Sequence, residues 1–260
     1  MPPWETIEEA PEGDYSVFSV RRQRMRSPTS GQTADFHVID APDWVNVVPV
    51  TSGGEVVCVR QYRPGTDEVT LEIPGGMIDA GERPVEAARR ELLEETGCTA
   101  DPLVSLGVVD PNPAIQSNCC HTFLAPQAVR EQPAAPDDTE ELTVEHVPLA
   151  DTGALVRDGR IRHALVVVAF HLLEQYVETR PADALPWPAE NARDPLENAL
   201  APSFVYVAPG AESSTRFPGA TPVLERPARA MMRLPCVVAE QRFTTEHAHP
   251  PKPPPTPTRK

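Results

Sequence analysis

Three glutamates, Glu91, Glu94 and Glu95, lie close together in a stretch whose apolar residues recur at helical spacing. At about 100° of rotation per residue, these side chains share about a quarter-turn of a helix surface. Glu91 and Glu95 are four residues apart, so their charges repel each other unless a positive charge lies between them. Carboxylate oxygens suit Mg²⁺ or Mn²⁺, and the spacing is compatible with a divalent-cation site. A solvated acidic face is the alternative, and it is the commoner arrangement for three glutamates without another signal.

The helix that would carry these glutamates has a start and a stop signal. Pro84 stands in its first turn, and Gly97 follows its last residue. Strands are expected on both sides of it, at 15–20, 36–40, 44–51, 55–62, 70–73, 104–109, 121–125 and 142–147. Ser52-Gly53-Gly54 predicts a tight turn that pairs 45–51 with 55–62 in antiparallel fashion. With a short helix near 149–156 and a long one at 160–178, the pattern predicts an α/β sandwich.

Charge and proline content both change near residue 180. The chain of 260 residues contains 23 Lys and Arg against 38 Asp and Glu, a formal net charge of −15. This acidity argues against a non-specific nucleic-acid-binding surface, which needs clustered positive charge. Half of the 32 prolines lie after residue 180 and predict a mostly disordered tail at 181–260. The apolar runs are far shorter than the roughly 20 residues of a membrane-spanning helix.

Cysteine usage gives a second indication of the setting. Five cysteines without regular spacing predict no disulfide framework, and the N-terminus shows no secretion signal, so a cytoplasmic protein is expected. Cys119, Cys120 and His121 are adjacent, but no second Cys/His pair stands at ligand spacing. The sequence therefore argues against a zinc site at this position.

The acidic helix belongs to a longer pattern with nine specified positions. It runs Gly76, five residues, Glu82, seven residues, Arg90-Glu91-Leu92, one residue, Glu94-Glu95, one residue, Gly97 and then Cys98. This pattern resembles the signature of the Nudix hydrolases at every fixed position but the last, where the family usually has an aliphatic residue. A buried cysteine behaves as a small hydrophobe, so the departure is minor. The resemblance implies the Nudix α/β/α sandwich around a mixed β-sheet, and metal-dependent hydrolysis of a diphosphate linked to another moiety.

The resemblance also implies roles by position. The implied metal ligands, for Mg²⁺ or Mn²⁺, are Glu91, Glu94, Glu95 and Gly76. The first two would also act in catalysis, together with Arg90, which would orient a neighbouring glutamate. Because Glu86 and Glu94 lie one turn away on either side, the fixed charge of Arg90 suits that role. Glu82 and Gly97 are implied as structural residues.

Two flanking segments extend the resemblance to the ADP-sugar pyrophosphatase branch of the family. They are Val59-Arg60-Gln61-Tyr62-Arg63-Pro64 and Thr70-Leu71-Glu72-Ile73-Pro74. Pro113, sixteen positions after Gly97, matches the branch's marker for ADP-ribose. In so proline-rich a chain, a coincidental proline is the alternative.

The branch implies further substrate contacts. Arg63, with Arg60 in the same segment, would bind phosphate, and a guanidinium suits bidentate phosphate binding. Phe36, or alternatively Trp44, would stack on the nucleobase, although aromatic side chains are as often part of a core.

The branch also implies a second catalytic carboxylate from a loop after the signature, where Glu140 is the first choice and Glu141 the second. A general base must reach the attacking water. In the loop at 112–121 the branch leads us to expect a basic residue at or near Cys119, which this chain lacks.

The sequence is thus identified as a Nudix hydrolase similar to ADP-ribose pyrophosphatases, which would cleave ADP-ribose to AMP and ribose 5-phosphate. The alternatives are another nucleoside-diphosphate sugar or dinucleotide as substrate, or a Nudix-fold sensor that binds a metabolite without catalysis. We expect an N-terminal strand region at 1–43, the hydrolase domain at 44–180 and the proline-rich tail at 181–260. By analogy the protein would be a homodimer, with a nucleoside-diphosphate sugar as ligand and neither nucleic acid nor membrane as partner.

Overall fold

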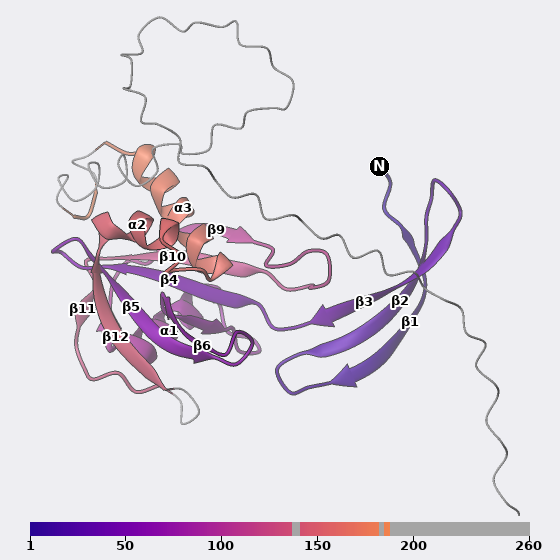
Figure 1. Ribbon diagram of the computed structural model, residues 1–260, viewed down its shortest axis with the longest axis horizontal. Helices are drawn as coiled ribbons and strands as arrows, with labels where there is room; N and C mark the ends of the chain where they lie inside the picture. The colour runs from indigo at the N-terminus through magenta and orange to yellow at the C-terminus, as the bar shows by residue number, and fades with distance from the viewer. Residues whose placement is uncertain (137–140, 182–184, 188–260) are drawn as a thin grey trace, which may run out of the picture. The chain divides into compact units, whose positions relative to one another are not determined.

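The computed structural model describes residues 1–136, 141–181 and 185–187. Its N-terminal part is a three-stranded antiparallel sheet of β1 (Glu5–Asp14), β2 (Ser19–Arg26) and β3 (Thr33–Asp40), with β2 in the centre (Figure 1). Opposite charges face each other across β1 and β2, as between Arg22 and Glu8 at 3.0 Å. Cross-strand pairs of this kind support an exposed sheet.

The sequence prediction missed β1 and began the first strand too early. Residues 15–18 form the turn between β1 and β2, and Ser16 has a positive φ of 68° there. β1 has no buried residue. Backbone hydrogen bonds and ion pairs hold it to β2, and neither of its faces packs on a core. A strand of this kind lacks the alternation on which the prediction depends.

The second sheet has seven strands in the order β12-β5-β4-β10-β9, with β6 beside β5 and β7 beside β4. Their bounds are β4 (Trp44–Val50), β5 (Glu55–Arg63), β6 (Glu68–Glu72), β7 (Gly75–Met77), β9 (Val104–Val109), β10 (Cys120–Pro126) and β12 (Leu142–Pro148). Among these described strands, β4 and β10 are parallel and the other pairs are antiparallel. The predicted mixed sheet is confirmed. A separate pair consists of β8 (Cys98–Thr99) and β11 (Val129–Arg130).

The turn at 52–54 is present, but the long hairpin predicted from it is wrong. The N–H of Gly54 donates to the carbonyl of Thr51 at 3.0 Å, and beyond this turn Val50 and Val56 are the strand residues that pair. The two strands then diverge, because β4 pairs along its length with β10 and β7, whereas β5 pairs with β12 and β6. A turn signal predicts the turn and not how far the strands stay together.

Helix α1 (Pro84–Thr96) carries the acidic motif and has the predicted ends. Glu86 accepts a hydrogen bond from the N–H of Arg83 at 3.2 Å, which caps the first turn. Gly97 ends the helix with a left-handed φ of 72°, and a Cβ there would overlap the carbonyl oxygen of Gln132. Glycine is required at this helix end for both reasons.

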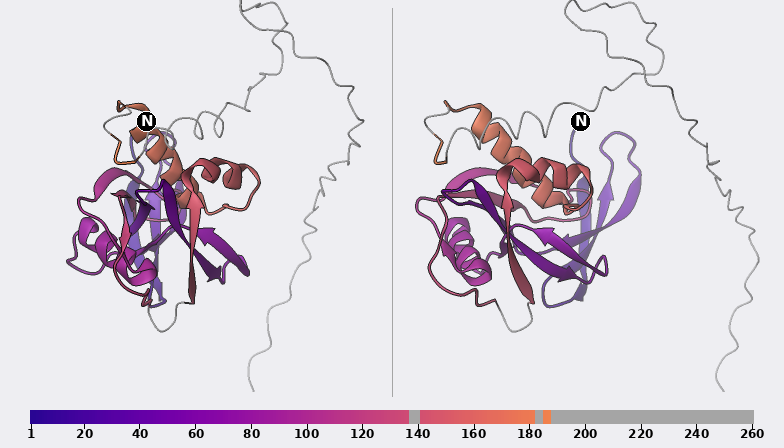
Figure 2. Two further views of the ribbon diagram at one scale, coloured as in Figure 1. Left: turned by 90° about the vertical axis from the view of Figure 1, so that its left-hand side faces the viewer. Right: turned by 60° about the vertical axis from the view of Figure 1, so that its left-hand side comes forward.

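Two hydrophobic clusters cover the two faces of the seven-stranded sheet. Side chains of β4 alternate between them, so that Val48 and Val50 join one cluster while Val45 and Val47 join the other. The first is covered by η1 (Leu149–Asp151), α2 (Thr152–Arg157) and α3 (Ala164–Glu178), and the second by α1. The sheet therefore lies between α1 and the pair α2 and α3, which is the predicted α/β/α sandwich (Figure 1 and Figure 2).

Two residues that the sequence assigns to the tail, Leu185 and Trp187, are buried in the cluster under α3. Apart from residues 181 and 185–187, the predicted disordered tail lies outside the described residues. Within the described part of the chain, no helix has both the length and the apolar character needed to cross a membrane.

Candidate active site

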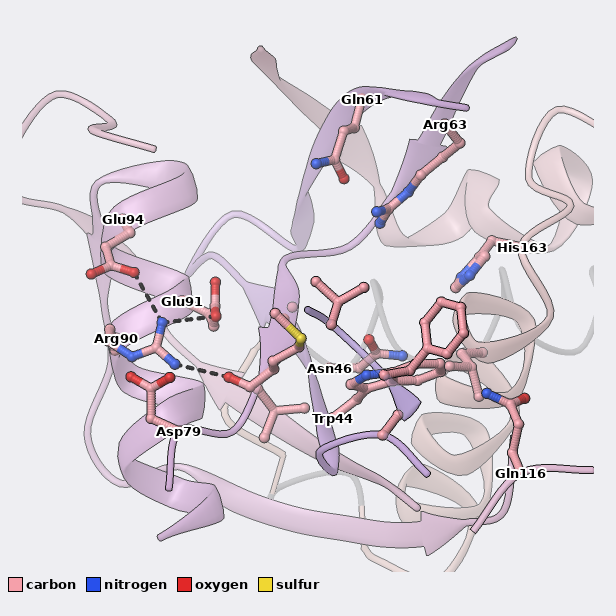
Figure 3. Close-up of a pocket in the computed structure, with 18 of the residues that line it drawn as sticks. Trp44, Asn46, Gln61, Arg63, Asp79, Arg90, Glu91, Glu94, Gln116 and His163 are labelled. Carbon is pink, nitrogen blue, oxygen red and sulfur yellow. Dashed lines mark hydrogen bonds and ion pairs between the residues drawn. The ribbon is translucent and has the colours of Figure 1, made fainter. Parts of the chain in front are cut away.

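Arg90 on α1 gathers acidic side chains around one guanidinium group (Figure 3). Its Nε and Nη2 donate to the two carboxylate oxygens of Glu82 at 3.1 and 3.0 Å. Its Nη1 donates to Glu91 at 2.8 Å and to Glu94 at 3.2 Å. Nη2 also donates to the carbonyl oxygen of Met77 at 2.9 Å, which ties α1 to β7. One fixed cation therefore holds three carboxylates and the strand before the helix.

The electrostatics of this cluster keep its charges in place. The hydrogen bond to Glu82 raises the pKa of Arg90 above its usual range, and the same contact lowers the pKa of Glu82. Glu86, the other acid one turn from Arg90, pairs with Arg83 at 2.6 Å instead, because it faces the start of the helix. Arg90 is thus directed to Glu82, Glu91 and Glu94.

The three glutamates of the acidic motif, Glu91, Glu94 and Glu95, have different surroundings. Glu91 and Glu94 line a cavity, whereas Glu95 is only 2% exposed and accepts a hydrogen bond from the N–H of Gly75 at 3.0 Å. Next to it, a Cβ on Gly76 would lie 2.5 Å from Cδ of Glu91. The backbone of β7 therefore approaches the glutamates as closely as only glycine permits.

The cavity beside these carboxylates has a volume of about 560 Å³. That size suits a ligand as large as a nucleotide. Glu91, Glu94 and Gly76 form one side of it, and Trp44 and Arg63 also line it (Figure 3). The carboxylates of α1 thus share one cavity with a second guanidinium group and an aromatic ring.

Arg63 is held in the cavity by Glu72. The Nε and Nη2 of Arg63 donate to the two carboxylate oxygens of Glu72 at 2.9 and 2.8 Å, and the hydroxyl of Thr70 donates to the first oxygen at 2.6 Å. Burial acts to raise the pKa of Glu72, but the hydrogen bonds from Arg63 and Thr70 outweigh it, so the pKa is lowered. His163 lies near, with Nδ1 3.7 Å from the same carboxylate. The ion pair between Arg63 and Glu72 fixes the direction of the Arg63 guanidinium.

Of the two aromatic candidates, Trp44 lines the cavity and Phe36 does not belong to its lining. Phe36 lies on β3, is 40% exposed, and contacts Trp4 edge-on with ring centroids 5.3 Å apart. Trp44, which the sequence analysis gave as the alternative to Phe36, is therefore the candidate that borders the cavity.

The cavity lining contains six polar or aromatic residues that were not predicted from the sequence: Phe18, Asn46, Gln61, Asp79, Gln116 and His163. Two of them had a local signal, because Asn46 interrupts an otherwise apolar strand and Gln61 shares a strand face with Arg63. The amide nitrogen of Asn46 is buried and has no hydrogen-bond partner among the described residues. Gln116 and His163 reach the cavity through tertiary contacts alone, from the loop before β10 and the start of α3.

The NUDIX domain model matches residues 42–170 of this chain. An ADP-ribose pyrophosphatase of Bacillus subtilis (strain 168) is 32% identical over 146 residues, which cover 56% of this chain and 79% of that protein. The chain belongs to the Nudix family.

Two further comparisons extend this finding. A protein of Bacillus methanolicus named methanol dehydrogenase activator is 30% identical over 147 residues, covering 56% of this chain and 79% of that protein. A crystal structure of an ADP compounds hydrolase superposes with a TM-score of 0.62 at 25% identity, covering 69% of this chain and 96% of the other. The predicted family and fold are confirmed.

Besides Phe36, two substrate contacts predicted from the Nudix resemblance do not belong to the cavity lining: Arg60 and Pro113. Arg60 donates from Nε to Glu145 at 2.5 Å across β5 and β12, because it points to the opposite face from Gln61. Pro113 lies in the turn before Gln116. Glu140 is outside the described residues, and the second choice, Glu141, is exposed directly before β12.

Nudix hydrolases generally need a divalent metal ion, and the donors present here fit one. Glu91 and Glu94 offer carboxylate oxygens to the cavity beside the backbone of Gly76. This donor set contains oxygen alone, which matches hard divalent cations. Because Gly76 has no Cβ, the carboxylate of Glu91 reaches the backbone there.

Proposed function

We propose that this Nudix hydrolase cleaves ADP-ribose to AMP and ribose 5-phosphate. The observation that carries the proposal is the common cavity: carboxylates fixed by Arg90 lie on one side, and Arg63 and Trp44 also line it. Relatives named ADP-ribose pyrophosphatase and ADP compounds hydrolase support this choice of substrate. Other nucleoside-diphosphate sugars and dinucleotides are the competing substrates within the same reaction class.

In this proposal Glu91, Glu94, Glu95 and Gly76 form the Mg²⁺ or Mn²⁺ site. When bound, the ion neutralises phosphate oxygens and lowers the pKa of coordinated water. Arg90 fixes the orientation of Glu91 and Glu94, so their oxygens need little rearrangement on binding. The carboxylate of Glu95 is held in place separately, because it accepts a hydrogen bond from the N–H of Gly75.

The chain's other residues orient the substrate. Arg63, held by Glu72, presents its guanidinium to the phosphates, and the indole of Trp44 offers a face to the adenine. Glu140, which lies outside the described residues, is proposed as the general base on the resemblance to the ADP-sugar pyrophosphatase branch. Arg60, Phe36 and Pro113 act at most indirectly in this arrangement, from positions outside the cavity lining.

The test is metal-dependent release of AMP from ADP-ribose by the full chain, compared with a panel of nucleotide sugars. We expect Glu94→Gln to lower turnover by about 10²–10³-fold while the protein stays folded. Glu86→Gln is the matched control, because Glu86 lies on the same helix and pairs with Arg83 away from the cavity. Turnover of Glu94→Gln within about twofold of the wild type would refute its assigned role.

A regulatory protein is the second candidate, favoured by the relative named methanol dehydrogenase activator. Calorimetric binding of ADP-ribose without AMP release would support a sensor. Metal-dependent turnover supports the enzyme.

We also propose the organisation 1–43, 44–180 and 181–260, a location in the cytoplasm and a homodimer that pairs through the N-terminal strands. β1 and β3 form the outer strands of the N-terminal sheet. Because β3 is already hydrogen-bonded at Ile39 to the segment 115–117, β1 offers the longer edge for pairing among the described residues. Light scattering coupled to size exclusion tests this pairing, and removal of residues 1–43 should give a monomer. A full-length monomer would overturn it.

A further inference from the structure

Three side chains outside the cavity bring metal-ligating atoms together. Asp43, Cys119 and His121 each offer one ligand atom, and these atoms all lie within 4.8 Å of one another. The sequence argued against zinc here because Cys119 and His121 have no second Cys/His pair nearby. Asp43 supplies the third ligand from 76 residues earlier (119 minus 43), a contact that only the fold creates.

The backbone holds the three residues in register. β4 and β10 are parallel, with Cys120 opposite Trp44 and His121 opposite Val45, so Asp43 and Cys119 lie side by side at the strand starts. The N–H of Cys119 donates to Oδ1 of Asp43 at 2.8 Å, and the N–H of Trp44 donates to the carbonyl of Cys119 at 2.9 Å. These contacts orient Asp43 through Oδ1, and its second oxygen faces His121.

The distances agree with a shared ion. Sγ of Cys119 lies 3.5 Å from Nε2 of His121, and Nε2 lies 3.9 Å from Oδ2 of Asp43. Tetrahedral zinc, with bonds of about 2.3 Å to sulfur and about 2.0 Å to nitrogen, places those two ligand atoms roughly 3.5 Å apart. With a bond of about 2.1 Å to oxygen, the same ion places Oδ2 roughly 3.4 Å from Nε2, so this oxygen must come about 0.5 Å closer than the observed 3.9 Å.

We propose that Asp43, Cys119 and His121 form a binding site for a zinc-type divalent transition metal, separate from the carboxylate site on α1. Thiolate and imidazole ligands select such metals, whereas the carboxylates of the helix select hard cations. The side chains of Asp43 and His121 are 45% and 23% exposed, which leaves a position for water as the fourth ligand. A bound ion would join the segment between β3 and β4 to β10, next to the cavity residue Trp44.

The experiment is a Co²⁺ titration of the full-length protein with Mg²⁺ in excess, so that Mg²⁺ competes for the oxygen-only site. We expect one equivalent of Co²⁺ to give a near-ultraviolet thiolate-to-cobalt charge-transfer band, and one equivalent of Zn²⁺ to remove it. Cys119→Ser should abolish the band, and Asp43→Asn and His121→Gln should weaken Co²⁺ binding. Circular dichroism establishes that each variant is folded.

Three controls locate the ligand. Cys120→Ala and Cys236→Ser should keep the band, because neither thiol is assigned to the site. Glu94→Gln should keep it too, so the result does not depend on the proposed hydrolysis. A wild-type protein without the band, or a band that persists in Cys119→Ser, would overturn the site and leave a thiol–imidazole hydrogen bond as the reason for the contact.

Discussion

Replacing Gly76 by alanine separates the geometry of the site from the stability of the fold. The new Cβ would lie 2.5 Å from Cδ of Glu91, whereas ordinary van der Waals contact begins at 3.4 Å. The carboxyl group must therefore retreat by at least about 0.9 Å (3.4 minus 2.5), since Oε1 of Glu91 would lie closer still. Because the obstacle is the end of a flexible side chain, the fold can accommodate the change.

The expected cost is in catalysis. A displacement of about 1 Å in a positioned group lowers the rate by roughly 100-fold, which corresponds to about 2.7 kcal/mol in the activation barrier. We expect Gly76→Ala to show this loss in kcat for AMP release at saturating Mg²⁺. Its urea unfolding curve in EDTA should stay within about 0.5 kcal/mol of the wild type.

Gly65→Ala is the control, since a Cβ at Gly65 would meet no atom within 4 Å. This variant should match the wild type in both assays. If Gly76→Ala retained kcat within about twofold, the position of Glu91 against the β7 backbone would not matter for the reaction. A large loss of stability with unchanged kcat would show that Gly76 is needed for the fold and not for the reaction, which is the reverse of what we expect.

Three other predictions concern buried charges and thiols. Arg63→Ala removes the bidentate partner of Glu72, whose side chain is 3% exposed, so we expect urea denaturation to show a loss of about 2–3 kcal/mol; a loss below about 0.5 kcal/mol would contradict this. Because the pKa of Glu72 is lowered from 4.5, its ionised form stabilises the fold above that value, and this contribution is lost as the pH falls through the lowered pKa. Unfolding free energies measured between about pH 6 and pH 3 should fall more steeply for the wild type than for Glu72→Gln, and parallel curves would be the refuting result. Burial raises the pKa of the Cys58 and Cys120 thiols to about 12, so mass spectrometry should find neither alkylated in the native protein at about pH 8 and both alkylated after unfolding; native labelling would show that the thiols are accessible.

The helix and most strands were predictable because their signals are local. Pro84 and Gly97 mark the ends of α1, and the strand from Val104 to Val109 has the predicted bounds. β1 was missed because it is stabilised by facing charges rather than by a buried side. The pairing of β4 and β5 was overestimated, since the partners that separate them come from distant parts of the chain.

The candidate site likewise contains residues that a local pattern predicts and residues that only the tertiary fold brings in. Glu91, Glu94 and Arg90 belong to one helix, so their spacing alone predicts that they lie close together. His163 and Gln116 join the cavity from segments that have no sequence relation to the motif. Likewise, the choice between Trp44 and Phe36 depends on which sheet each strand enters, and no local pattern decides that.

The parallel pairing of β4 with β10 also bears on how the nascent chain folds. Trp44 and its partner Cys120 are separated by 76 positions (120 minus 44), so the pair closes a long loop. Such non-local contacts slow folding, because the chain loses the entropy of loop closure before the contacts stabilise it. During synthesis, β4 has made its turn toward β5 well before the ribosome adds residues 120–126. Until then β4 presents an open edge, and a chain arrested at that stage offers it to any other strand within reach.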